Sequence, residues 1–229
     1  MTNKKVLITG ADGGLGTYVT RAFLGAGAKV AGLSRKIKKE DFPEASFIAI
    51  ASQITSAADA QSAIESVVKQ LGGLDVVVHT VGGFAGGKNV DQTDDATFRR
   101  MFDMNLNSAF YAFRAAIPYL RKSSSGRIIA IGSRAAVDPG PGIWAYSASK
   151  AALVSLVRTV ALENKDAGLT ANVILPGTID TPANRQAMPG ADISLWVQPE
   201  NIASLVMWLA GDAGKDVNGA AIPVYGSGV

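Results

Sequence analysis

The chain has 229 residues, of which 48% are hydrophobic and 18% charged, and its formal net charge is +3. This length and composition suit one α/β domain with a substantial core and exclude a disordered chain. There is no cysteine, which excludes disulfides and thiolate chemistry and agrees with the reducing conditions of the cytoplasm. Because there is also only one histidine, the chain has little material for a transition-metal site, and no metal is expected.

Two classes of partner are not expected from the sequence. The first residues, MTNKKVLITGADGG, reach glycine before a signal-like apolar run develops, and no apolar segment approaches membrane-spanning length. No basic stripe with interleaved aromatic residues, which would be typical of nucleic-acid binding, is present. We therefore expect a cytoplasmic protein that binds a small molecule, without a membrane or nucleic-acid partner.

Short runs rich in β-branched residues alternate with segments of helical period along the chain, which predicts parallel βαβ units. The runs are nearly continuously apolar, as expected for strands that are covered on both faces. The sequence therefore predicts an α/β fold, with residues 1–229 as a single Rossmann-type domain around a doubly wound parallel sheet of about seven strands. The predicted strands are 5–9, 29–34, 46–50, 74–80, 126–132, 170–176 and 220–225.

Helices are expected between these strands, where apolar residues recur at helical spacing. Residues 178–198 show no clear periodicity, and such a long irregular stretch in a compact domain is often a lid over a binding site. The predicted helices cover 15–26, 60–71, 94–121 as one or two helices, 145–165, and a last one between Pro199 and Gly211.

The stretch TGADGGLG, residues 9–16, lies between the first predicted strand and the first predicted helix. Glycines there permit a tight turn and close backbone approach, and the helix N-terminus offers free N–H groups to a dinucleotide's pyrophosphate. The spacing is G-x-x-x-G-x-G rather than the general G-x-G-x-x-G. The expected cofactor-binding residues of this stretch are Gly10, Asp12, Gly13, Gly14, Leu15 and Gly16.

The stretch AYSASKAAL places Tyr146 four residues before Lys150, so that both side chains share one helical face. A tyrosine four residues before a lysine often occurs by chance, so this spacing alone indicates no function. Together with the glycine stretch, however, YSASK resembles the short-chain dehydrogenase/reductase family, and the resemblance covers essentially the whole chain. It implies a nicotinamide-dependent oxidoreductase with a catalytic tetrad of Asn105, Ser133, Tyr146 and Lys150.

Physical chemistry explains why the tetrad suits carbonyl reduction. A phenol with a pKa of ~10 stays protonated at pH 7, but a nearby lysine ammonium stabilises the phenolate. We therefore expect Lys150 to lower the pKa of Tyr146, which would then exchange protons near neutrality. By resemblance, Lys150 also binds the nicotinamide ribose, Ser133 donates to the substrate oxygen, and Asn105 orders a water path to solvent.

The second predicted strand ends in GLSRKIKKE and carries no early carboxylate. An acidic residue there would suit the ribose of NAD, whereas Ser34 and Arg35 can hold a 2′-phosphate. The second basic residue that NADP-preferring relatives carry in the glycine stretch is missing, because Gly13 occupies that position. The cofactor is therefore expected to be NADP(H) by preference, with NAD(H) possible.

After the fourth predicted strand the family usually reads Asn-Asn-Ala-Gly, and this chain reads HTVG, with only the glycine matching. His79 is therefore interpreted as a structural substitute, and altered bracing near the cofactor is expected. The resemblance implies further cofactor contacts from Thr80, Val81, Gly82, Pro176, Gly177, Ile179 and Thr181.

Residues 81–87 and 175–196 are similar to segments of dihydropteridine reductases, a branch of the same family. That branch typically lacks the catalytic serine and has an acidic residue where this chain has Arg35, so its pterin substrate is not transferred. Six residues are candidates for lining the substrate pocket, although each can equally be packing: Phe84, Arg134, Trp144, Asn184, Met188 and Trp196.

The resulting prediction is an NADPH-preferring reductase that acts on a small or medium carbonyl compound, or an enzyme that oxidises the matching alcohol. The alternatives are a dihydropteridine-reductase-like reduction of a quinonoid or C=N substrate, and an NADP-binding regulatory module without turnover. By resemblance, a homodimer or homotetramer is expected, formed through 94–121 and 145–165.

Overall fold

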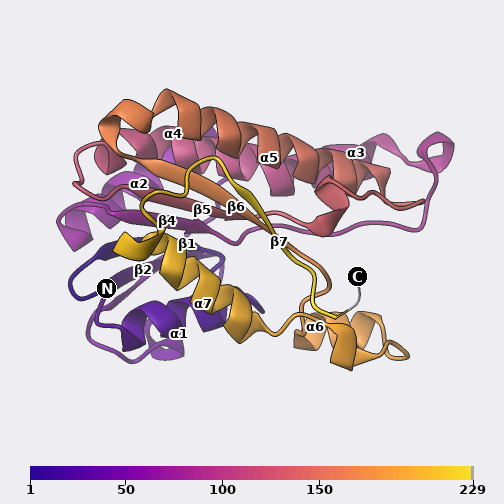
Figure 1. Ribbon diagram of the computed structural model, residues 1–229, viewed down its shortest axis with the longest axis horizontal. Coiled ribbons are helices and arrows are strands. Elements are labelled where there is room, and N and C mark those ends of the chain that lie inside the picture. The colour runs from indigo at the N-terminus through magenta and orange to yellow at the C-terminus, as the bar shows by residue number, and fades with distance from the viewer. Residues whose placement is uncertain (228–229) are drawn as a thin grey trace.

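Seven parallel strands form one sheet in the computed structural model, which describes residues 1–227 (Figure 1). The sheet order is β3-β2-β1-β4-β5-β6-β7, which confirms the predicted fold class. Three predicted strands have the observed bounds, and the others differ by one or two residues at an end. The strands are β1 (Lys5–Thr9), β2 (Lys29–Ser34), β3 (Phe47–Ala51), β4 (Val76–His79), β5 (Arg127–Ile131), β6 (Thr170–Pro176) and β7 (Ala221–Val224).

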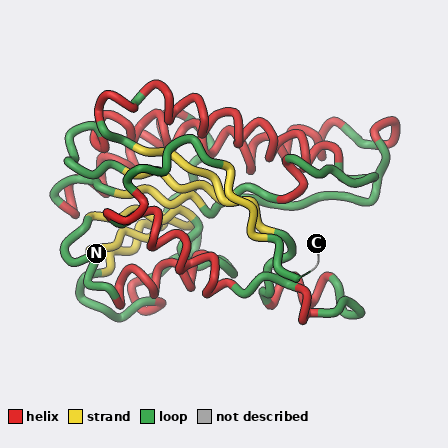
Figure 2. Tube along the Cα trace, in the orientation of Figure 1, coloured by secondary structure: helices red, strands yellow, loops and turns green. Residues whose placement is uncertain are grey.

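Helices cover both faces of the sheet, so that the strands form the middle of three layers (Figures 1 and 2). One face is covered by α1 and α7, and the other by α2, α4 and α5, while α6 projects away from the sheet. The helices are α1 (Gly16–Gly25), α2 (Ala57–Leu71), α3 (Asp95–Phe102), α4 (Ser108–Leu120), α5 (Trp144–Glu163), α6 (Pro182–Ala187) and α7 (Pro199–Ala210).

Two apolar cores lie on the two faces of the sheet. Along β1, Leu7 packs in the core beneath α2, α4 and α5, whereas Val6 and Ile8 pack in the core beneath α1 and α7. Successive side chains of a strand point to opposite faces, so a strand covered on both faces must be apolar at every position. This double burial explains the continuous apolar runs in the sequence.

The strand order changes direction between β1 and β4, the first of which leads to β2 and the second to β5. At such a point the connections leave the carboxyl ends of the two strands toward opposite faces and open a crevice between them. The glycine stretch follows β1, and the sequence HTVG begins at His79, the last residue of β4. Both motifs therefore lie at this crevice.

Two segments differ in detail from the expectation. The helical region 94–121 is interrupted between α3 and α4 by a π-helical turn, Asp103–Asn107. The irregular stretch 178–198 contains α6, whose signals are Thr181 as the N-cap and Pro182 in the first turn. Six residues are too few for a periodicity analysis to detect. Within residues 1–227, no helix combines the length and the apolar character needed to cross a membrane.

Candidate active site

The turn between β1 and α1 requires glycine at two positions. Gly10 has φ of +74°, and a Cβ atom on it would lie 2.8 Å from Thr80 Oγ1. A Cβ on Gly16 would lie 1.9 Å from the carbonyl oxygen of Gly10, which no side chain could occupy. The Gly13 N–H donates to that same carbonyl at 2.9 Å and closes the turn. The turn therefore presents bare backbone at the N-terminus of α1, an arrangement that suits a phosphate group.

Thr80 braces this turn from the neighbouring strand. Its hydroxyl lies 2.7 Å from the carbonyl oxygen of Thr9 and 3.2 Å from that of Gly10. The Thr80 N–H also donates to the Thr9 carbonyl at 3.1 Å. The altered sequence after β4 thus still holds the glycine turn, with a hydroxyl at the position where the resembled family carries an asparagine amide.

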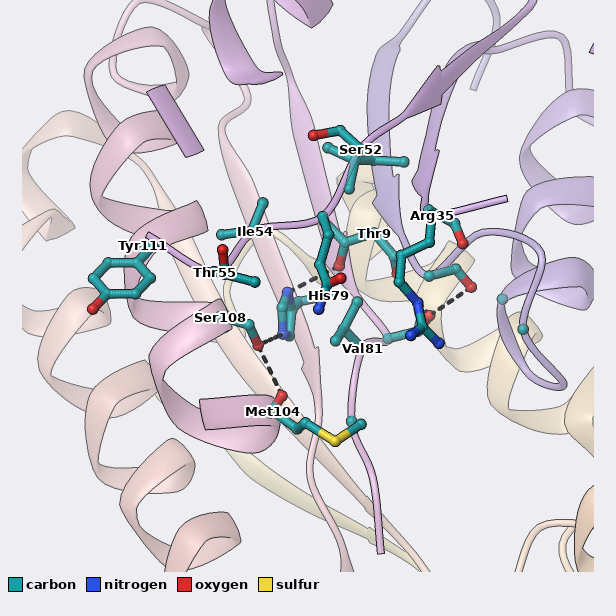
Figure 3. Close-up of a pocket in the computed structure, with 18 of the residues that line it drawn as sticks. Thr9, Arg35, Ser52, Ile54, Thr55, His79, Val81, Met104, Ser108 and Tyr111 are labelled. Atoms are coloured by element: carbon teal, nitrogen blue, oxygen red, sulfur yellow. Dashed lines mark hydrogen bonds between the residues drawn. The ribbon is translucent and has the colours of Figure 1, made fainter. Parts of the chain in front are cut away.

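A cavity of about 650 Å³ lies at the carboxyl ends of β1, β2 and β4 (Figure 3). Its volume falls in the range of cofactor and ligand sites. The absence of side chains at its glycines leaves a cradle for a pyrophosphate beside the N-terminus of α1, so the residues present fit a dinucleotide. The predicted residues that line it are Gly10, Gly13, Gly14, Leu15, Gly16, Ser34, Arg35, Thr80, Val81 and Gly82.

The same cavity has a second wall that the sequence analysis did not assign. Residues 52–55 directly follow β3 at the same edge of the sheet, so their position along the chain could have revealed them. No local sequence pattern indicates that residues of α4 line the cavity, because only the tertiary packing brings the first turn of this helix over β4. The unassigned lining residues are Thr9, Leu33, Ser52, Gln53, Ile54, Thr55, His79, Asp103, Met104, Asn107, Ser108 and Tyr111.

Asp12, a predicted cofactor contact, lies outside this lining. It lines a second groove, of about 560 Å³, at the N-terminal end of α1 and the segment after β2. That groove has a mixed charge, because two lysines and two carboxylates face it. Its lining residues are Asp12, Thr17, Lys36, Lys38, Asp41 and Phe42.

Lys150 is buried in α5. Its Nζ donates to the carbonyl oxygen of Ile131 at 2.9 Å, and burial lowers the pKa of this ammonium to about 8. A Cβ atom on Gly82 would lie 3.0 Å from Lys150 Nζ and 3.0 Å from Asn105 Oδ1. Two members of the predicted tetrad therefore lie against Gly82, the residue of HTVG that matches the family and that lines the cavity, although no member of the tetrad is itself among the lining residues.

Tyr146 lies near the N-terminus of α5, and Ser133 lies just past β5. Burial raises the pKa of the Tyr146 phenol above its ordinary value, and a hydrogen bond with Ser133 acts in the opposite direction. The prediction that Lys150 lowers this pKa is therefore wrong for the chain by itself. The physical reason is that burial disfavours the charged form, while the Lys150 ammonium bonds to Ile131. Tyr146 is thus protonated at neutral pH, which is the form that donates a proton.

Asn105 lies within the π-helical turn and is fully buried. Its Oδ1 accepts from the Gly83 N–H at 2.9 Å, and its Nδ2 donates to the Gly83 carbonyl at 3.0 Å. Nδ2 also donates to Ser149 Oγ at 3.0 Å, and this hydroxyl donates to the Tyr146 carbonyl at 2.7 Å. Asn105 therefore joins the segment after β4 to the helix that carries Tyr146 and Lys150.

One substrate candidate contacts the tetrad. The Phe84 ring lies edge-on to the Tyr146 ring, with centroids 5.1 Å apart and an interplanar angle of 72°. Phe84 is also 65% exposed, so one side of the ring faces solvent beside the phenol. Met188 is likewise exposed, whereas Trp196 is half-buried at the end of the segment 178–198.

Other substrate candidates have partners within the protein. The Trp144 ring stacks on Phe98 of α3, and its Nε1 donates to Thr93 Oγ1 at 2.8 Å. Arg134 forms an ion pair of 2.8 Å with Asp138 and lies over the ring of Tyr225. Asn184 Nδ2 donates to the carbonyl of Ile179 at 2.8 Å. The polar side-chain nitrogens of Trp144 and Asn184 thus have partners within the protein.

The base of the segment 178–198 is closed by its own backbone. Asp180 N–H donates to the Val197 carbonyl, and Val197 N–H donates to the Thr178 carbonyl, both at 2.8 Å. Ile179 forms the β-bridge partner of Val197. Thr181 lies against the glycine turn, since a Cβ atom on Gly14 would be 3.0 Å from its Cγ2.

Pro176 and Gly177 lead from β6 into this segment. Gly177 lies so close to the last strand region that a Cβ atom on it would be 2.7 Å from the Tyr225 carbonyl. Among the side chains of residues 1–227, no group of three or more His, Asp or Glu residues is placed to hold a metal ion.

Known proteins resemble the chain over almost its whole length. A family model described as short chain dehydrogenase matches residues 4–191. The cyclic-di-GMP-binding biofilm dispersal mediator protein of Escherichia coli is 35% identical, over 99% of this chain and 97% of its own. The 2-(S)-hydroxypropyl-CoM dehydrogenase 3 of Xanthobacter autotrophicus is 32% identical, over 99% and 96%. The crystal structure of a dehydrogenase/reductase from Sinorhizobium meliloti 1021 has a TM-score of 0.86 and 32% identity, over 100% of this chain and 96% of that one.

Proposed function

Since the chain belongs to the short-chain dehydrogenase family and is an NAD(P)-dependent oxidoreductase, we propose that it uses NADPH to reduce a small or medium-sized carbonyl compound, or oxidises the matching alcohol. The observation that carries this proposal is the approach of Lys150 and Asn105 to Gly82, which lines the main cavity. A bound nicotinamide supplies the hydride in the reduction. The relative from Xanthobacter is named as a dehydrogenase of 2-(S)-hydroxypropyl-CoM, and a hydroxyl-bearing substrate agrees with the proposed interconversion of an alcohol and a carbonyl compound.

The roles of the side chains follow from their protonation and contacts. Tyr146 donates the proton to the carbonyl oxygen, since a phenol is protonated at neutral pH and burial, which raises its pKa, keeps it in that form. Ser133, which hydrogen-bonds Tyr146, donates to the same oxygen as negative charge develops there. Lys150, whose pKa is about 8, carries positive charge at neutral pH and binds the ribose hydroxyls. Asn105 orders a water path by which Tyr146 is reprotonated from solvent.

Tyr146→Phe tests the role of the phenol. Removing the proton donor should lower the turnover of a panel of ketones and aldehydes at least about 100-fold. NADPH affinity, measured by fluorescence titration, should remain, because the cavity lining does not include Tyr146. Tyr119→Phe removes a hydroxyl from the C-terminal end of α4 and serves as the control. Full activity of Tyr146→Phe would end the proposal.

The NADPH preference is supported by the cationic residues at the end of β2. Arg35 and Ser34 line the main cavity, and Lys36 and Lys38 line the adjacent groove. The Arg35 guanidinium is exposed and presents a planar set of donors that suits a 2′-phosphate.

Arg35→Asp should invert the preference, because a carboxylate repels a phosphate and accepts from ribose hydroxyls. The loss of the charged hydrogen bonds should weaken NADPH binding roughly 10- to 100-fold. Calorimetric titrations with NADPH and NADH measure both affinities, and Lys69→Asp on α2 controls for a change of net charge. Equal or tighter binding of NADH by the unaltered chain would contradict the preference.

A second candidate function is a nucleotide-binding regulatory protein without turnover. It is favoured by the 35% identity to a relative that is named for binding cyclic di-GMP. Tight NADPH binding with no oxidation of it across a broad carbonyl panel would favour this candidate. Oxidation of NADPH that Tyr146→Phe abolishes would exclude it.

Two further properties belong to the same proposal. The segment 178–198 acts as a lid over the substrate, since its base contacts the glycine turn and most of its residues are exposed. The chain forms a homodimer or homotetramer through α3, α4 and α5, on which Phe98, Phe110 and Leu162 expose apolar side chains. Sedimentation equilibrium measures the number of subunits.

A further inference from the structure

His79 is the only histidine of the chain, and the proposed mechanism does not use it. It ends β4, is fully buried, and forms part of the wall of the main cavity. Its Nδ1 lies 2.9 Å from Thr9 Oγ1, and its Nε2 lies 3.4 Å from Ser108 Oγ. Figure 3 shows Thr9, His79 and Ser108 in a row that links β1, β4 and α4, with Met104 beyond Ser108.

The donors and acceptors available in this row fix the direction of each of its hydrogen bonds. Ser108 Oγ donates its single hydrogen to the carbonyl oxygen of Met104 at 2.8 Å, because a carbonyl can only accept. Ser108 can therefore only accept from His79, so that Nε2 carries the ring hydrogen. Nδ1 is then bare and accepts the hydroxyl hydrogen of Thr9. The ring is neutral, since burial and the nearby Lys150 charge lower the pKa of His79 to about 3.

The row ends at the π-helical turn that carries Asn105. The backbone N–H of Ser108 donates to the carbonyl of Asp103, five residues earlier, rather than to that of Met104 as in an α-helix. The Ser108 hydroxyl donates to Met104 instead. The Ser108 hydroxyl thus gives the Met104 carbonyl the hydrogen bond that the Ser108 N–H would give it in a regular α-helix. Single π-helical turns of this kind are frequent at functional sites.

We propose that His79 is a positioning residue: through Ser108 it holds the π-helical turn open and so places the Asn105 amide on Gly83 and beside Lys150. Asn105 Oδ1 and Nδ2 bond both backbone groups of Gly83, and Oδ1 would be 3.0 Å from a Cβ on Gly82. A regular α-helical turn would rotate Asn105 away from these partners. The effect of His79 on turnover rests on the function proposed above, whereas its effect on the structure does not.

The tautomer can be measured on the whole chain, because a single histidine gives a single set of imidazole signals. In ¹⁵N-labelled protein, long-range ¹H–¹⁵N spectra at pH 7 should show Nε2 protonated and Nδ1 bare. Thr9→Val removes the donor to Nδ1 at nearly constant volume and should shift the Nδ1 resonance. A hydrogen on Nδ1 in the unaltered chain would overturn the proposal, because the direction of the row would be reversed.

Ser108→Ala tests whether the row acts on Asn105. It should speed hydrogen exchange of the Gly83 amide roughly tenfold, as the loss of about one hydrogen bond predicts. Ser108→Thr restores the hydroxyl and should restore the protection, which loss of packing alone would not do. Ser66→Ala, on the exposed side of α2, is the matched control. Unchanged exchange of Gly83 in Ser108→Ala, or no rescue by threonine, would overturn the proposal.

Turnover separates this proposal from the enzymatic one. If Tyr146→Phe abolishes ketone reduction, Ser108→Ala should lower kcat roughly tenfold, and Ser108→Thr should recover it. If the chain turns over no carbonyl compound, the proposed function fails, while the tautomer and the Gly83 exchange still decide the role of His79.

Discussion

Gly82 occupies the position where three parts of the proposed site meet. It lies in the segment after β4, lines the main cavity, and has no side chain to separate Lys150 from Asn105. Its backbone φ is not in the left-handed region, so glycine is needed there for space rather than for conformation. The requirement for glycine therefore comes from what the neighbouring helices place around it.

Gly82→Ala should disturb the site without disturbing the fold. The added Cβ would lie 3.0 Å from both Asn105 Oδ1 and Lys150 Nζ, so that one of the two must move by a few tenths of an ångström. A small misplacement of positioning groups should lower kcat for carbonyl reduction by about tenfold or more. Gly25→Ala, where a Cβ meets nothing within 4 Å, is the control. Unchanged kcat in Gly82→Ala would show that this approach is not functional.

At the scale of elements, the π-helical turn contributes to the wall of the cavity, and the segment 178–198 contacts the glycine turn through Thr181. The turn between α3 and α4 carries Asn105 and directs Ser108 toward His79. The segment is closed at its base by backbone hydrogen bonds but exposes apolar side chains beyond them, at Met188, Ile193 and Leu195. Exposed apolar side chains on one irregular segment are expected where that segment covers a ligand.

Hydrogen exchange tests whether 178–198 is a lid. In the free chain, amides of 183–195 should exchange quickly, because these residues are largely exposed. Saturating NADP⁺ should slow exchange at 178–182, since Thr181 packs against Gly14. Residues 65–71 of α2, away from the cavity, should not change. Protection of 10–16 without any change in 178–198 would show that the cofactor binds and that this segment is not a lid.

At the scale of the whole molecule, the buried His79 makes stability depend on pH. Its pKa is about 3 in the folded chain, against 6.5 for an ordinary histidine. Below pH 6.5 the unfolded chain binds a proton that the folded chain does not, so the free energy of unfolding falls as pH falls toward 3. The stability from this residue is fully present above pH 6.5.

Between pH 7 and pH 5, where few carboxylates titrate, this difference should lower the free energy of unfolding by about 2 kcal/mol. Urea denaturation at several pH values measures it. In the His79→Asn variant position 79 does not titrate, so the free energy of unfolding should change much less between pH 7 and pH 5. This holds even if the variant is less stable than the unaltered chain at every pH. Parallel pH dependence in both chains would contradict the buried neutral histidine.

Particular elements show how far the sequence leads. The β-branched runs and the glycine stretch were enough to predict the fold class, and the strands 5–9, 29–34 and 170–176 have the observed bounds. The sequence also predicted that Tyr146 and Lys150 lie on one helix, and both belong to α5. The direction of the Tyr146 pKa shift could not be predicted, because it depends on burial, which a motif does not contain. Trp144 was a candidate either for the substrate pocket or for packing, and its stacking on Phe98 depends on tertiary contacts that the sequence does not contain.

The sequence by itself determined the order of strands and helices, the glycine turn and the family, since these depend on local spacing and on which residues avoid water. Only the tertiary structure decided which elements meet at the cavity. The first turn of α4 reaches over β4, and His79 lies between Thr9 and Ser108, residues 70 positions before it and 29 after it. Such contacts depend on the sheet order and on helix packing, which bring together residues that no local pattern connects.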